Sequence, residues 1–218
     1  MARKTAILIS GRGSNMAALL DAAKAPGYPA EIVLVASNRP GAAGLGIAAG
    51  HGISTRAIDH TAYETREDFE TALTAELEKA GAELVCLAGF MRLLTDGFVK
   101  HWRDKLINIH PSLLPAFKGM DTHARALAAG VKITGCSVHF VREEMDSGPI
   151  IAQAAVPVLA GDDEAALAAR VLDAEHALYP MALALVASGR ARVVGEKVMV
   201  EENSPPDYRP LISPPSAG

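Results

Sequence analysis

Short apolar runs alternate along the first half of the chain with longer stretches rich in alanine, leucine and glutamate. The runs TAILIS (5–10), EIVLVAS (31–37) and ELVCLAG (83–89) have the composition and length of buried strands. The stretches SNMAALLDAAKA (14–25) and REDFETALTAELEKAG (66–81) favour helices. Strands that alternate with helices are typical of a parallel sheet covered on both faces. The pattern therefore predicts an α/β fold with a mostly parallel, twisted sheet.

The second half of the chain has less helix between its apolar runs. KLINIH (105–110) continues the first series, and TGCSVHFV (134–141) and PIIAQAAVPV (149–158) are predicted as two further strands. We therefore expect a sheet that is mixed in its C-terminal half. The glycine-rich stretch GAAGLGIAAG (41–50) is predicted to begin a close-packed helix, and we assign it no binding site.

The pattern weakens towards the C-terminus. A long helix is expected from Asp163 to about Leu178, capped by GDDE and interrupted by Pro180. The last 18 residues, EENSPPDYRPLISPPSAG, contain five prolines and no periodicity, which predicts a loose tail over residues 201–218. The alternative is a segment that wraps over a partner subunit. We expect residues 1–200 to form a single domain.

Charge and composition narrow the class of protein. The formal net charge of −4 gives no general attraction to nucleic acid or to an anionic membrane, so an anionic ligand must be met by local arginines. The apolar run in the N-terminal MARKTAILIS is too short for a signal peptide or a membrane span, so we expect a cytoplasmic protein. Cys86 and Cys136 lie in apolar strands and are predicted to be buried free thiols.

The first chemical signal is ISGRGSNMAALL, in which a predicted strand passes through Gly11, Gly13 and Asn15 into a helix. Backbone N–H groups and a helix N-terminus then point to one place, which suits a phosphate group. A dinucleotide site is less well supported, because Met16 stands where a small residue is needed and the second strand ends in Ser-Asn-Arg without an acid. The alternative is that these glycines only make a tight strand-to-helix turn.

The second signal is NIHPSLLPAFKG at residues 108–119. Residues two apart in a strand face the same side, so Asn108 and His110 project together while Ile107 and Ile109 face the opposite layer. In a parallel sheet this position is the carboxyl end of a strand, where open α/β sheets bind their ligands. An amide and an imidazole can donate two hydrogen bonds to the oxyanion of an acyl-transfer intermediate. The alternative is a capping asparagine and a satisfied core histidine.

The third signal is Asp146 in VREEMDSGPII, at a turn just ahead of a predicted strand. A carboxylate beside His110 would favour the charged imidazolium, an acid that works near neutral pH. On its own, an aspartate in a turn is most often only a turn former. His110, His123, His139 and Asp146 are also possible metal ligands, but no tight ligand spacing such as H-E-x-x-H is present.

Several fragments together resemble the folate-dependent phosphoribosylglycinamide formyltransferase family. ISGRGSN, LAGFMRLL, NIHPSLLPAFKG, SVHFV, MDSGPII, VPV and EHALYP occur in the family's order and spacing, over about residues 4–197. The resemblance implies a Rossmann-like formyltransferase fold. It also implies transfer of a formyl group from the co-substrate 10-formyltetrahydrofolate to the amine of glycinamide ribonucleotide in purine (IMP) biosynthesis, without a metal.

The resemblance also implies roles for particular residues. His110 would be the general acid, Asn108 an oxyanion donor that also contacts the folate, and Asp146 the carboxylate that supports the histidine. The ribonucleotide would contact Gly13, Ser14, Asn15 and Glu175, and the folate would contact Arg66, Met91, Arg92, Leu93 and Leu94. Residues 1–105 would then be the phosphate-binding half and residues 106–200 the folate and catalytic half. The bond between Leu114 and Pro115 would be cis. Asp121 departs from the family pattern, which leaves the role of its loop open.

Three other functions remain possible on this fold. Formyltetrahydrofolate deformylase, a hydrolase, would use the same Asn, His and Asp with water as the acceptor. That hydrolase is expected to carry an additional domain ahead of the catalytic domain, whereas the first strand here begins at Thr5. Methionyl-tRNA formyltransferase would need an RNA-binding domain and a basic surface. A non-catalytic nucleotide sensor would not need all three catalytic residues. We therefore expect small-molecule substrates only, no nucleic-acid or membrane partner, and a monomer or homodimer.

Overall fold

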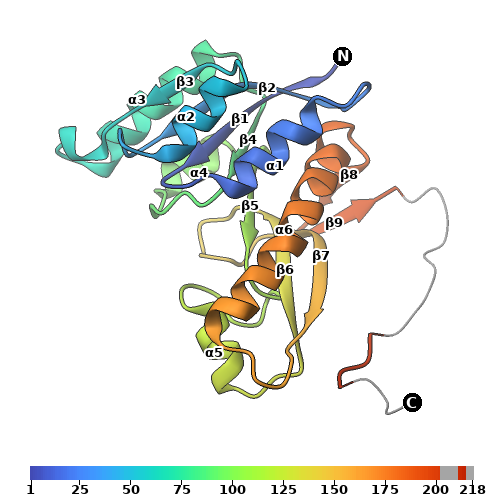
Figure 1. Ribbon diagram of the computed structural model, residues 1–218. Helices are drawn as coiled ribbons and strands as arrows, with labels where there is room; N and C mark the ends of the chain where they lie inside the picture. The colour runs from blue at the N-terminus through green and yellow to red at the C-terminus, as the bar shows by residue number, and fades with distance from the viewer. Residues whose placement is uncertain (202–210, 215–218) are drawn as a thin grey trace.

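The centre of the molecule is one seven-stranded sheet. Its strands run through the middle of the ribbon, with helices packed around them (Figure 1). This computed structural model describes residues 1–201 and 211–214. The strand order is β3-β2-β1-β4-β5-β6-β7. The first five strands pair in parallel, and β6 is antiparallel to both β5 and β7. The strands are β1 (Arg3–Ile9), β2 (Ala30–Ser37), β3 (Thr55–Ala57), β4 (Leu84–Leu87), β5 (Leu106–His110), β6 (Ile133–Phe140) and β7 (Ile150–Pro157). The predicted α/β fold with a mixed C-terminal half is confirmed.

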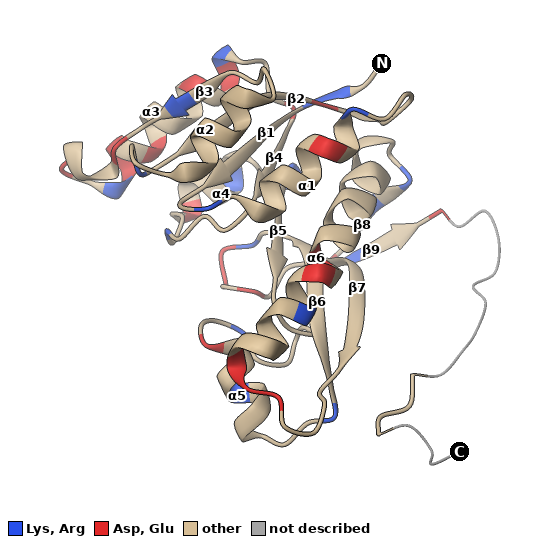
Figure 2. Cartoon of the chain, viewed as in Figure 1, with Lys and Arg blue, Asp and Glu red and all other residues tan. Residues whose placement is uncertain are grey.

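Helices cover both faces of this sheet. One apolar cluster joins the sheet to residues of α1, α2, α5 and α6, and a second joins it to α3 and α4. The helices are α1 (Ser14–Ala23), α2 (Ala43–Gly50), α3 (Arg66–Lys79), α4 (Asp96–His101), α5 (Thr122–Ala128) and α6 (Glu164–Ala187), with a short 3₁₀ turn, η1 (His60–Ala62). Basic and acidic residues are interspersed over these elements (Figure 2).

The alternation of side chains along β5 decides what reaches the site. Ile107 and Ile109 belong to the cluster that contains α6, and Leu106 belongs to the cluster on the opposite face. Since side chains two apart share a face, Asn108 and His110 lie on the Leu106 side of the sheet. The predicted separation of the two isoleucines from the two polar residues is therefore confirmed.

The prediction that Pro180 interrupts the last helix is wrong. The expected cap is present, because Asp163 accepts a hydrogen bond from the Ala166 N–H at 2.8 Å, but α6 continues to Ala187 with Pro180 inside it. Its apolar face also continues, and Leu183 and Val186 are buried beyond the proline. A proline inside a helix costs about 3 kcal/mol. Burial of each large apolar side chain contributes about 1.5–3 kcal/mol, so the packing outweighs the proline.

Several short elements were not predicted from the sequence. These are β3, α4, α5 and a separate antiparallel hairpin of β8 (Ala191–Val194) and β9 (Lys197–Val200). Most of the predicted tail, residues 202–210 and 215–218, lies outside the described residues. Cys86 and Cys136 are buried free thiols, as predicted. Within the described part of the chain, none of the helices has the length and apolar character needed to cross a membrane.

Candidate active site

The loops that follow β1 and β4 are joined at the carboxyl edge of the sheet. The Ser10 N–H donates to the Gly89 carbonyl at 3.1 Å, and the Met91 N–H donates to the Ser10 hydroxyl at 2.7 Å. A hollow of about 270 Å³ opens beside them. It is lined by Ser10, Gly11, Arg12, Gly13, Ser14, Asn15, Arg39, Ala88, Gly89 and Met91. The predicted phosphate loop therefore borders a real depression that also carries two arginines.

The glycine at position 13 is required by the protein itself. Its backbone has φ +75°, and a Cβ there would lie 3.1 Å from the Met16 Cε and 3.2 Å from the Gly44 Cα. The Gly44 N–H donates to the Gly11 carbonyl at 3.0 Å, which fixes α2 against the loop. Gly13 therefore serves the tight strand-to-helix turn in the first place. The turn also leaves the N-terminus of α1 open at Ser14, which is exposed.

The family resemblance assigns this loop to the ribonucleotide, and on that assignment Gly13→Val is expected to distort the loop and weaken ribonucleotide binding while folate binding changes little. A left-handed backbone costs a side chain about 1–2 kcal/mol, and the added methyl groups press on Met16. Isothermal titration with each ligand separately measures the two affinities. Gly27→Val is the matched control, since Gly27 has φ +80° and open space around its Cβ position. Equal loss of both affinities in folded Gly13→Val protein would refute the assignment.

The predicted catalytic residues meet on one face of the sheet. The ladder between β5 and β6 pairs Asn108 with His139 and His110 with Ser137. Asp146, in the loop between β6 and β7, places Oδ2 3.4 Å from the His110 Nδ1 and Oδ1 3.7 Å from the His139 Nε2. An amide, two imidazoles and a carboxylate thus share one small, largely buried volume.

The hydrogen bonds of the two histidines assign their nitrogens. The His110 Nε2 lies 3.0 Å from the Phe117 carbonyl, so Nε2 is the donor and Nδ1 faces Asp146. His139 Nδ1 lies 3.0 Å from the Phe140 carbonyl and must donate to it. Burial lowers the pKa of His139 and so favours the neutral ring, in which Nε2 is the acceptor.

The neutral His139 therefore orients Asn108. The Asn108 Nδ2 lies 3.3 Å from the His139 Nε2, so one amide hydrogen points at the ring and the second is available to a ligand. From the sequence, His139 is predicted only as a possible metal ligand. The signal that identifies its position is the antiparallel register between β5 and β6, which the sequence alone did not specify.

Asp146 is both a turn residue and a partner of the histidines. Its backbone has φ +52°, as expected for a tight turn. Its Oδ2 accepts a hydrogen bond from the Gly119 N–H at 2.9 Å, which joins this loop to the one after β5. The bond between Leu114 and Pro115, in that second loop, is cis, as the family resemblance implied.

Glu175, on α6, lies against the predicted phosphate loop. Only 6% of it is exposed, and its Oε2 accepts a hydrogen bond from the Asn15 Nδ2 at 2.7 Å. Burial raises the pKa of Glu175, and the bond from Asn15 opposes this effect. One turn further on, the Tyr179 hydroxyl is 3.0 Å from the Leu87 carbonyl at the end of β4 and 3.2 Å from the Ile107 carbonyl within β5. The structure brings Asn15 and Glu175 into contact, and the family resemblance assigns both of them to the ribonucleotide.

The predicted folate residues are less closely grouped. Met91 and Leu93 are exposed, and Leu94 is half-buried. The Arg92 guanidinium is 5.9 Å from the centre of the Phe69 ring, so it packs on α3. Arg66 is exposed at the start of α3, and no described residue forms a hydrogen bond or ion pair with it. The structure therefore does not place Arg66 with the catalytic residues by any direct contact.

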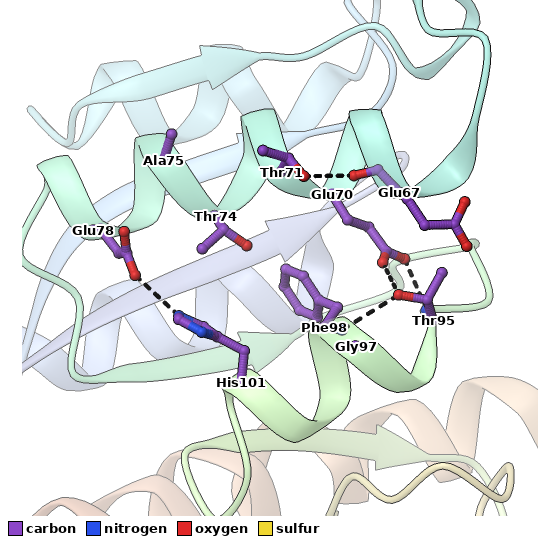
Figure 3. A pocket seen from close by; sticks show the side chains of 10 residues that line it. All are labelled: Glu67, Glu70, Thr71, Thr74, Ala75, Glu78, Thr95, Gly97, Phe98 and His101. Atoms are coloured by element: carbon purple, nitrogen blue, oxygen red, sulfur yellow. Dashed lines mark hydrogen bonds and ion pairs between the residues drawn. The ribbon is translucent and has the colours of Figure 1, made fainter.

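A second hollow, of about 450 Å³, lies between α3 and α4 (Figure 3). The Glu70 carboxylate accepts hydrogen bonds from the Thr95 N–H at 2.9 Å and from the Thr95 hydroxyl. His101 lies 3.0 Å from Glu78 across the hollow. None of the predicted site residues lines it. Although it is larger than the hollow beside Gly13, its polar groups pair with one another and do not converge on a ligand.

The possible metal ligands do not form a metal centre in the described part of the chain. There, no group of three or more His, Cys, Asp and Glu side chains is arranged to hold an ion. His123 is half-buried on α5, and burial lowers its pKa. Independence of added metal remains a prediction for solution measurements.

Comparisons with known proteins agree on one group of enzymes. The profile of the formyl transferase family matches residues 3–183. Phosphoribosylglycinamide formyltransferase of Escherichia coli is 44% identical over 86% of this chain and 88% of its own length. The trifunctional purine biosynthetic protein adenosine-3 of Gallus gallus is 54% identical over 87% of this chain, which spans about a fifth (19%) of that protein.

Solved structures give the same result. Glycinamide ribonucleotide transformylase 1 of Symbiobacterium toebii is 43% identical with a TM-score of 0.90, and the match covers 92% of this chain and 95% of that one. Formyltetrahydrofolate deformylase of Burkholderia mallei is 32% identical with a TM-score of 0.84, over 93% of this chain and 71% of that one. The hydrolase thus shares the fold at lower sequence identity.

Proposed function

The chain belongs to the formyl transferase family, and from this premise we propose that it transfers a formyl group from 10-formyltetrahydrofolate to the amine of glycinamide ribonucleotide in purine biosynthesis. The observation that carries the proposal is the meeting of Asn108, His110 and Asp146 at the carboxyl edge of the sheet. Relatives with the same activity in their names support it at 44% identity over most of the chain.

The geometry supports a direct transfer. The substrate amine attacks the formyl carbon, and the carbonyl oxygen becomes an oxyanion that accepts a hydrogen bond from the free Asn108 amide hydrogen. The positive charge of protonated His110 stabilises it from nearby, while the two ring nitrogens keep the Phe117 carbonyl and Asp146 as partners. Collapse of this intermediate breaks the bond to N10 of the folate. The proton lost by the amine passes to N10 through water ordered by Asp146. Pre-oriented donors of this kind stabilise the transition state without moving during the reaction.

The two substrates would enter from the two sides of this centre. The phosphate of the ribonucleotide binds the backbone of Gly13, Ser14 and Asn15, and Glu175 binds its polar part. The folate lies against Met91, Arg92, Leu93 and Leu94, and Arg66 supports it from α3. The chain needs no metal for this chemistry, acts in the cytoplasm on small molecules, and does so as a monomer or homodimer.

A formyl-transfer assay tests the proposal. Purified protein, treated with a chelator and given no metal, is supplied with 10-formyltetrahydrofolate in the presence and in the absence of glycinamide ribonucleotide. We expect folate turnover that depends on the ribonucleotide and yields formylglycinamide ribonucleotide. Turnover of equal rate without the ribonucleotide would identify a deformylase instead, and no turnover in either case would refute the proposal.

Glu175→Gln is expected to raise the stability of the protein near pH 7 and to weaken substrate binding. Because burial raises the pKa of Glu175, the folded protein binds its proton more readily than the unfolded chain. The stability that this group contributes is therefore present when the pH is below its ordinary pKa of 4.5, and it is lost as the pH rises through the raised pKa of the folded protein. Glutamine keeps an acceptor for Asn15 without the charge, so the variant should be the more stable protein near pH 7.

The same variant should bind the ribonucleotide less well. Hydrogen bonds to charged groups contribute about 1.5–3 kcal/mol, so we expect its KM to rise roughly 10- to 100-fold. Denaturant unfolding between pH 4 and 8 and steady-state kinetics measure the two effects, with the exposed Asp173→Asn on the same helix as the control. A variant less stable than the parent near pH 7, with an unchanged KM, would contradict both expectations.

A further inference from the structure

Arg142 is a buried arginine at the base of the loop that carries Asp146. It is only 8% exposed, and each of its nitrogens has a partner. Its Nη2 donates to the Asp104 Oδ1 at 2.7 Å, its Nε to the Glu196 Oε2 at 3.0 Å, and its Nη1 to the Val141 carbonyl at 3.1 Å. The planar guanidinium is thus fixed in direction by two acids from separate parts of the chain.

The first of these acids lies just ahead of the strand that carries Asn108 and His110. Asp104 is two residues before Leu106, where β5 begins. The Val141 N–H also donates to the Leu106 carbonyl at 2.9 Å. The contact of Arg142 with Asp104 and the adjacent contact of Val141 with Leu106 therefore tie the beginning of the β6–β7 loop to the beginning of β5.

The second acid comes from the hairpin of β8 and β9, beyond residues 3–183 that the family profile matches. Glu196 lies between these two strands and also accepts a hydrogen bond from Arg103 at 2.8 Å. Arg103 in turn lies 3.8 Å from Glu143, which is in the same loop as Asp146. The loop, which bears both charge types in Figure 2, is thus anchored to the hairpin as well.

The C-terminal end of this loop is also held against the end of β6. The Phe140 N–H donates to the Pro149 carbonyl at 2.9 Å, and a Cβ on Gly148 would lie 1.7 Å from the Phe140 carbonyl oxygen. The loop therefore leaves and rejoins the sheet at one narrow neck. Its direction at that neck decides how far Asp146 stands from His110.

We propose that Arg142 is a positioning residue that, held by Asp104 and Glu196, fixes the β6–β7 loop so that Asp146 stays against His110 and His139. The inference rests on the proposed function for its kinetic consequences. Stability alone explains the cluster poorly, because replacing a buried ion pair by apolar residues of similar size is often neutral or stabilising. A cluster at the neck of the loop has a geometric use, since it sets the position of a side chain four residues away.

The kinetic test is a double-mutant cycle between Arg142→Met and Asp146→Asn. Residues of one network are energetically coupled, so we expect Arg142→Met to lower kcat roughly tenfold with both KM values within about twofold of the parent. Arg142→Lys keeps the charge but lacks the forked guanidinium that reaches both acids. Its kcat should lie between those of the parent protein and of Arg142→Met. In the Asp146→Asn background, Arg142→Met should change kcat no further.

Two controls separate positioning from a loss of stability or of function. Arg170→Met removes an arginine that pairs with Asp162 at 2.7 and 2.9 Å at the start of α6, and it should leave kcat unchanged. The imidazole NMR signals of His110 and His139 in ligand-free protein should shift in Arg142→Met and not in Arg170→Met. This second measurement holds even if glycinamide ribonucleotide proves not to be the substrate.

The outcomes are distinct. Unshifted imidazole signals in folded Arg142→Met protein, or kcat losses that multiply in the Arg142→Met/Asp146→Asn double variant, would overturn the positioning role. Shifted signals together with failure of the parent protein in the formyl-transfer assay would refute the proposed function and retain the positioning role.

Discussion

Asp146→Asn is expected to lower kcat on the order of 10²- to 10⁴-fold, the range typical of a lost acid–base group, with little change in either KM. Asparagine keeps the size of the side chain and an oxygen for the Gly119 N–H, but it removes the charge that faces His110 Nδ1 at 3.4 Å and His139 Nε2 at 3.7 Å. His110 would then lose the partner of its protonated form. Since that interaction matters most as charge develops, the loss should fall on kcat. Steady-state kinetics with both substrates, repeated across pH, measure it.

His110→Ala should be equally damaging, and the double variant little worse than either single one. Residues that act as a unit give strongly non-additive losses. Asp162→Asn is a suitable control, because Asp162 is also an ion-paired aspartate, but its partner is Arg170 on α6. An Asp146→Asn protein with near-parental kcat and an unchanged pH profile would reduce Asp146 to a turn residue, and the acid–base part of the mechanism would be withdrawn.

Asn108→Ala is expected to lower kcat roughly 10²- to 10³-fold, the usual effect of removing one oxyanion donor. The amide hydrogen directed at the ligand is lost, and the His139 Nε2 loses its donor at 3.3 Å. Binding of the folate should weaken less than the rate falls, because the donor acts mainly on the charged intermediate. Single-turnover kinetics with saturating substrates separate the chemical step from binding.

The same strand supplies the control for Asn108. Ile109→Val shortens a core side chain on the opposite face, which typically costs about 0.5–1.5 kcal/mol of stability, and it should leave kcat unchanged. If Asn108→Ala and Ile109→Val gave the same kcat, Asn108 would be a structural residue, and the oxyanion would have to be held by His110 alone.

Local patterns were enough to predict the sheet and the face of each functional side chain on β5. Apolar runs have a period of two in strands, so the opposition of Ile109 and His110 follows from the sequence itself. The continuation of α6 past Pro180 did not follow, because it depends on the apolar face beyond the proline finding partners in the core. Short exposed elements such as β8 and β9 carry too few apolar positions to give a pattern.

The site was predictable in part for the same reason. Asn108 and His110 are two residues apart, so a local rule places them together. The position of His139 opposite Asn108 and the tie between Arg142 and Glu196 depend on strand register and on contacts across the chain. No spacing rule in a single sequence encodes such contacts. The turn ahead of a predicted strand made Asp146 a candidate, whereas only the resemblance to a family pointed to Glu175.

The late position of α6 in the chain has a consequence for synthesis on the ribosome. Ile7 and Ile9 of β1, near the N-terminus, belong to the same apolar cluster as Leu167 and Leu183 of α6. At about 5–20 residues per second, roughly 10–40 s pass between the appearance of β1 and that of the helix that covers it. During that interval the nascent chain exposes an apolar sheet face that can bind other chains. We therefore expect the yield of folded protein to depend on translation speed and on chaperones that shield this face until α6 emerges.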